Sequence, residues 1–154
     1  MADEIKAEYE KLRKKHNSLP DYNKLNDEFE IANIDYPNFL LREIRHKMCD
    51  KIVDFAKIFE ELITAESFVN MHELKAFVSD DKKKIFDLFR ELMKINRGSL
   101  LLRLNEDDKA NAKFIGDALL RWMQLKKEIY PVLEKLESAW DSDIDIKQKL
   151  TYFG

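Results

Sequence analysis

The chain contains very little glycine, proline and cysteine for its length. Its 154 residues include three Gly, three Pro and one Cys. Few glycines and prolines leave few obligatory turns, so most of the chain is expected in long regular elements, and helices are the long elements that need least Gly. The single cysteine, Cys49, excludes an internal disulfide and any zinc site built from several cysteines, and a lone cysteine is typical of a reducing compartment. We therefore expect an all-α, cytoplasmic protein.

Long apolar runs and a large excess of one charge are missing as well. Uninterrupted apolar runs such as Leu100 to Leu102 are far too short to cross a bilayer, and the first residues, Met-Ala-Asp-Glu-Ile-Lys, are charged. Charged residues make up 37% of the chain in both signs, with a net charge of −3. This balance favours a solvated surface over a chain that binds nucleic acid through its overall charge. The sequence predicts no association with a membrane.

The apolar residues, 45% of the chain, recur at helical spacing. We predict a single-domain bundle over residues 1–140, with about four main helices and one or two short ones, followed by a tail over 141–154 that docks on the bundle or stays mobile. The strongest pattern starts at Pro37 and steps by three or four residues to Leu62. The expected main helices are 4–19, 37–62, 79–104 and 105–140, and the short ones are 22–29 and 68–77.

Three details of the helices are less determined by the sequence. Gly98 either ends the third main helix or lets two backbones approach while the helix continues. Asn105, followed by three acidic residues, is expected to cap the last helix, because acids are favoured at a helix N-terminus. Pro131 lies inside that helix and predicts a kink just before it.

Motifs for catalysis, metal binding and phosphate binding are largely absent. Glu43 and His46 have the Glu-x-x-His spacing of carboxylate-bridged di-metal bundles, but those sites need a second copy, which this chain lacks. They remain metal candidates beside the simpler interpretation of a solvated helix surface. Cys49 lies mid-helix without an activating base, so packing is its expected role. We predict no cofactor and no catalytic residue.

Two groups of cations make polyanion binding an alternative. Acidic residues are interleaved with the first group and precede the second, which favours local cancellation over a binding stripe. The candidates for binding nucleic acid or another polyanion are Arg42, Arg45, Lys47 and Lys51 on the second main helix and Lys82, Lys83 and Lys84 on the third.

The strong signals concern packing, so the leading hypothesis is a non-catalytic interaction or scaffold protein that binds a protein partner or a second copy of itself. Aromatic residues dominate interface energetics, and three of them lie at the end of the last helix or beyond it. Trp140, Tyr152 and Phe153 are therefore the partner-binding candidates. A metal protein or an enzyme without a local motif is the remaining alternative, and it requires Glu43, His46 and Arg121 to meet in one pocket.

Overall fold

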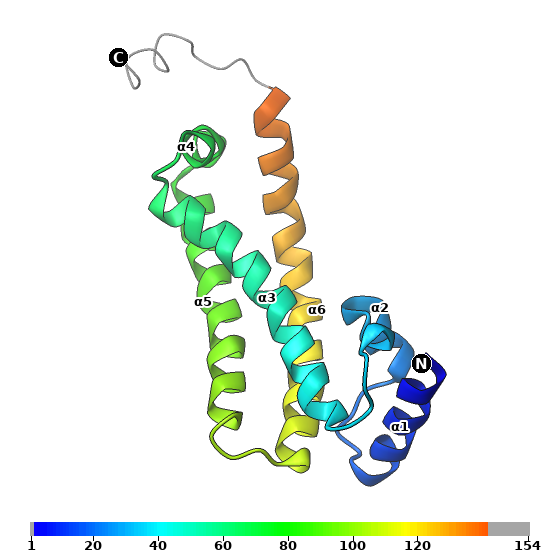
Figure 1. The fold of residues 1–154 in the computed structure, drawn as a ribbon. Helices are drawn as coiled ribbons and strands as arrows, with labels where there is room; N and C mark the ends of the chain where they lie inside the picture. The colour runs from blue at the N-terminus through cyan, green and yellow to red at the C-terminus, as the bar shows by residue number, and fades with distance from the viewer. Residues whose placement is uncertain (1, 142–154) are drawn as a thin grey trace.

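A computed structural model describes residues 2–141 of the protein (Figure 1). These residues form six α-helices and two 3-10 turns, and they contain no β-strand, which confirms the all-α class. The elements are α1 (Ala2–Lys15), α2 (Tyr22–Phe29), η1 (Ile31–Asn33), α3 (Leu40–Thr64), α4 (Phe68–Leu74), α5 (Ser79–Leu102), α6 (Asp108–Ser138) and η2 (Ala139–Asp141).

The three longest helices, α3, α5 and α6, build the centre of the molecule. Figure 1 shows them running lengthwise beside one another, with α3 starting at the end of the bundle where α5 turns into α6. The apolar seam predicted for α3 is buried, since Ile44, Met48 and Ile52 are completely inaccessible to solvent. Helix α5 packs against both α3 and α6, as its wide apolar arc predicts.

The N-terminal helices α1 and α2 pack against the lower part of the bundle in Figure 1. The buried phenol of Tyr9 donates a hydrogen bond to the carbonyl oxygen of Pro20 at 2.6 Å, and burial raises its pKa. The segment between α1 and α2 also passes close to α6. A Cβ at Gly116 would lie 2.4 Å from the carbonyl oxygen of Ser18, so only glycine permits this approach.

Two main helices begin later than the sequence predicts. Helix α3 starts at Leu40 rather than Pro37, because Phe39 adopts a left-handed conformation with a φ of 55°. Helix α6 starts at Asp108, and its cap is Asp107, whose side chain accepts a hydrogen bond from the Lys109 amide at 3.1 Å. The expectation of an Asn105 cap is therefore wrong; Asp107 is one of the acids that follow it.

Gly98 and Pro131 both lie inside helices. Helix α5 continues through Gly98 to Leu102, where a Cβ on the glycine would meet the Phe114 ring at an ordinary 3.7 Å. Helix α6 continues past Pro131, and its apolar seam resumes with the buried Val132. Among residues 2–141, no helix combines the length and the hydropathy needed to cross a membrane. Of the predicted tail 141–154, only Asp141 falls within the described residues.

Candidate interaction site

A cleft of about 560 Å³ lies between residues 33–39 and the first three turns of α3. Phe39, the residue before α3, lies at the junction of the two segments that line the cleft, and its side chain forms no capping hydrogen bond. A left-handed backbone is unfavourable for a residue that carries a bulky side chain. Here it leads the chain into α3 and leaves the phenylalanine ring largely in solvent.

Two exposed aromatic rings belong to this cleft. Tyr36 is 73% exposed and Phe39 is 71% exposed. The Arg42 guanidinium lies 4.4 Å from the centre of the Phe39 ring, which is cation–π distance. Large aromatic side chains normally contribute most when they are buried, so two exposed rings at one cleft indicate a surface suited to binding.

The charged residues of the cleft have no ion pairs within the part of the chain that the structure describes. Asp35, Glu43 and Asp50 contribute three carboxylates, and Lys47 contributes one ammonium group. None of the four forms a salt bridge with any residue from 2 to 141. With the histidine counted as neutral, three negative charges and one positive charge give the lining a net charge of about −2.

His46 also lines the cleft, and its Nε2 atom is shielded from solvent without a hydrogen-bond partner in the described part of the chain. Buried polar atoms are nearly always hydrogen-bonded, so an unpaired one needs an explanation. The two metal candidates, Glu43 and His46, thus share one cleft. Residues 2–141 nevertheless contain no group of three or more His, Cys, Asp or Glu side chains that could hold a metal ion.

Arg45, next to His46 in sequence, is completely buried on another side of α3. Its Nε donates a hydrogen bond to Asn111 Oδ1 at 2.9 Å. One terminal guanidinium nitrogen donates to the Ser99 carbonyl oxygen at 2.7 Å and to the Ser99 hydroxyl at 2.6 Å. The other terminal nitrogen donates to a Glu106 carboxylate oxygen at 2.7 Å. Asn111 also donates to Glu106 at 3.2 Å. We call these four residues the Arg45 cluster; it joins α3 to α5 and to the start of α6.

The cations considered for polyanion binding are not gathered on one surface. Arg45 is buried, and Lys51 donates to the Glu28 carbonyl oxygen while lying over the rings of Phe29 and Trp122. Arg42 lies in a small hollow with three acids, and Lys47 lies in the acidic cleft. Lys82, Lys83 and Lys84 are at the start of α5, whereas Arg45 bonds to Ser99 near the end of that helix. The two cationic groups therefore lie toward opposite ends of α5.

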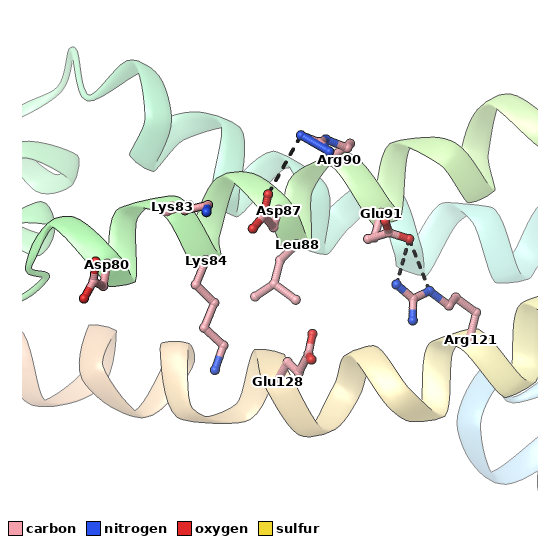
Figure 2. Close-up of a pocket in the computed structure, with 9 residues that line it drawn as sticks. All are labelled: Asp80, Lys83, Lys84, Asp87, Leu88, Arg90, Glu91, Arg121 and Glu128. Carbon is pink, nitrogen blue, oxygen red and sulfur yellow. Dashed lines mark hydrogen bonds and ion pairs between the residues drawn. The ribbon is translucent and has the colours of Figure 1, made fainter.

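A second hollow, of about 550 Å³, lies between α5 and α6 (Figure 2). Its cations and acids are balanced in number, and Figure 2 shows Lys84 extending from α5 into the space between the two helices and Glu128 entering that space from α6. Arg121 pairs with Glu91 at 2.7 Å, and this hydrogen bond is the main reason why the pKa of Glu91 is lowered. Arg121 therefore belongs to this groove and does not meet Glu43 and His46.

Trp140, a partner-binding candidate, lies against the described bundle. It remains 43% exposed, but its indole nitrogen donates to Glu73 at 3.3 Å and its ring is 4.6 Å from that of His72. His72 Nε2 lies 2.8 Å from the carbonyl oxygen of Ala139, so α4 is attached to the end of α6. Tyr152 and Phe153, the other two candidates, lie outside the described residues.

No protein-family model, no curated protein and no solved structure matches this chain. The function is therefore inferred from the residues themselves. Sequence reasoning identified Glu43, His46 and Lys47 individually but missed Tyr36 and Phe39. The available signal was a pair of aromatics in a polar, non-periodic stretch beside Pro37, where no core position is expected.

Proposed function

We propose that this protein is a non-catalytic interaction module that holds a segment of a partner protein in the cleft between residues 33–39 and α3. One observation supports the proposal above others: two aromatic rings that are more than 70% exposed lie at a cleft whose charged groups have no ion pairs within residues 2–141. A charged or aromatic group that stabilises the fold is normally paired or buried. The side chains of this cleft are available to another molecule.

The net negative charge of the lining favours a partner segment that carries lysine or arginine. A cationic side chain beside Tyr36 or Phe39 gains a cation–π contact of about 0.5–1 kcal/mol, and more as it is desolvated. Asp35, Glu43 and Asp50 attract the same cation electrostatically. His46 lines the same cleft, but its Nε2 is shielded from solvent, so the other groups of the lining carry the proposed contacts.

The test is affinity isolation from native cells with tagged wild-type protein and with the double variant Tyr36→Ala/Phe39→Ala. The matched control is Leu120→Ala/Tyr130→Ala on α6, whose side chains are similarly exposed at 69% and 66%. A partner of the cleft should be retained by wild type and control and lost from the Tyr36/Phe39 variant. Binding of the purified partner should then weaken at least tenfold in that variant.

Equal retention by the Tyr36/Phe39 variant would contradict the proposal. Equal losses in both variants would contradict it as well, because they would show a general effect of removing exposed apolar surface. Thermal unfolding of the three proteins provides the folding control. Exposed substitutions of this kind are expected to change stability by no more than about 0.5 kcal/mol.

A further inference from the structure

The outer side of α5 carries an exposed apolar surface. Most of its residues are three, four or seven positions apart in the sequence. Because an α-helix turns by about 100° per residue, these residues lie on one side of the helix, within an arc about 100° wide. They point away from the buried Leu88 and Leu92. We call this surface the α5 face; its residues are Phe86, Arg90, Arg97, Leu100 and Leu101, with Leu104 in the turn that follows.

The apolar members of the α5 face are strongly exposed. Leu101 is 70% exposed and Leu104 is 85% exposed, while Phe86 and Leu100 are 49% and 40% exposed. Single exposed leucines are normal on protein surfaces, but Leu100, Leu101 and Leu104 lie close together at the end of α5 and in the turn that follows, and clustered exposed apolar side chains are typical of interaction sites.

The charges near the C-terminal end of the α5 face have one sign. From Leu92 to Asn105 the only charged residues are Lys94, Arg97 and Arg103, all cationic. Arg97 and Arg103 are exposed, and their side chains have no hydrogen-bond or ion-pair partner among residues 2–141. The ion pair between Arg90 and Asp87 is long, at 4.0 Å. The end of the α5 face thus combines apolar contact area with two nearby arginines, Arg97 and Arg103, that have no partner among residues 2–141.

We propose that the α5 face binds an acidic amphipathic helix of a partner protein. A second helix laid along α5 presents apolar side chains at the same steps of three and four, which can pack beside Leu101 and Leu104. Its flanking Glu or Asp side chains meet Arg97 and Arg103, whose planar guanidinium groups bind carboxylates through two hydrogen bonds. An anionic membrane fits less well, because Asp107 and Asp108 are exposed shortly after Leu104.

This inference is independent of the proposed function of the cleft. The cleft is net negative, whereas the α5 face is positive, so the two surfaces select partners of opposite charge. A chain that uses both can bring two different partners together.

The test uses the full chain with isotope labelling and two designed helical peptides of eighteen residues. Both peptides carry the same leucine stripe, flanked by glutamates in one and by lysines in the other. The acidic peptide should bind saturably and shift backbone resonances of residues 86–104, and its affinity should exceed that of the basic peptide at least tenfold. Arg97→Glu/Arg103→Glu and Leu101→Ser/Leu104→Ser should each weaken it at least tenfold.

The charge-matched control is Lys14→Glu/Lys15→Glu, which reverses two exposed lysines at the end of α1 and should leave the affinity within about twofold. The proposal is overturned if the two peptides bind equally, if the control weakens binding as much as Arg97→Glu/Arg103→Glu, or if the shifted resonances lie outside α5. It is also overturned if only anionic phosphatidylserine vesicles bind the protein. Self-association in analytical ultracentrifugation that Leu101→Ser/Leu104→Ser abolishes would instead assign the face to a second copy.

Discussion

Arg45 and His46 are consecutive residues of α3, yet their polar groups have opposite surroundings. All three guanidinium nitrogens of Arg45 donate to the protein, whereas the shielded Nε2 of His46 has no partner among residues 2–141. Consecutive helix residues point about 100° apart, so one residue reaches the interior between α3, α5 and α6 while the next reaches the cleft. One helix thus carries a polar cluster that joins it to α5 and α6 and, beside it, a shielded imidazole nitrogen without a partner among residues 2–141.

Two hollows of similar size differ in the same way. The cleft and the groove between α5 and α6 have nearly equal volumes, about 560 and 550 Å³. The groove is bridged by the Glu91–Arg121 ion pair, whereas the charges lining the cleft have no ion pair with described residues. The size of a hollow therefore does not identify a binding site, and the pairing state of its side chains is the more informative property.

The largest expected effect is in the Arg45 cluster. Replacing Arg45 by Ala leaves Asn111, the Ser99 carbonyl group and Glu106 without their cationic donor, so we expect a loss of about 3–5 kcal/mol in the free energy of unfolding. Lys47→Ala, two residues further along the same helix and on its cleft side, should change the free energy of unfolding by no more than about 0.5 kcal/mol. Urea denaturation measures both, and equal effects would remove the distinction between the two sides of α3.

Acid should weaken the Arg45 cluster through Glu106. Partial burial acts to raise the pKa of Glu106, but the hydrogen bond from Asn111 and the charges of Arg45 and Arg42 outweigh it and lower the pKa below its usual 4.5. Because the folded-state pKa is the lower one, the stabilisation is complete above the unfolded-state pKa and is lost as pH falls through the folded-state pKa.

We therefore expect Glu106→Gln to destabilise the protein by about 1–2 kcal/mol near neutral pH. The difference from wild type should shrink as the pH is lowered below 4.5. Urea titrations at several pH values measure it, with Glu43→Gln in the cleft as the matched control. A difference that is constant with pH would show that the charge of Glu106 does not contribute.

A smaller effect of opposite sign is expected at His46. Replacing a shielded, unpaired polar group by an apolar one of similar size is neutral or stabilising, so His46→Leu should raise the free energy of unfolding by up to about 1 kcal/mol. A clear loss of stability would mean that the imidazole contributes to the fold, and the contrast with Arg45 would disappear.

The smallest effect is expected at Phe39. Asparagine tolerates a left-handed backbone better than phenylalanine, so Phe39→Asn should stabilise the protein by about 0.5 kcal/mol, less the lost contact with Arg42. Differential scanning calorimetry on wild type and variant provides the measurement. A lower melting temperature would show that the Phe39 ring contributes to stability despite its exposure.

Much of the fold could be predicted because the apolar residues of α3 and α6 keep helical spacing over many turns. Ile44, Ile52 and Trp122 belong to those seams, and all three are buried. The start of α3 could not be placed, because nothing in the residues around Pro37 indicates that Phe39 adopts a positive φ. The start of α6 was ambiguous because several residues that can cap a helix follow one another, and local sequence does not show which one accepts the bond.

The candidate site was predictable only in part. The spacing of Glu43 and His46 indicated that they share a helix face, and both line the cleft. Tyr36 was missed because it lies in a segment without periodicity. Arg45 resembled the surface cations beside it, since the groups that bury its charge, Ser99 and Asn111, are 54 and 66 residues away in the chain.

The contacts of Lys51 bear on the order in which the helices pack during folding. This one side chain bonds the Glu28 carbonyl oxygen of α2 and lies over the Trp122 ring of α6, while the Glu28 carboxylate accepts from that indole at 2.8 Å. The surface that receives α2 exists only after α3 and α6 have come together. We therefore expect α2 to dock after α3 and α6 have packed together during folding, and to leave before they separate.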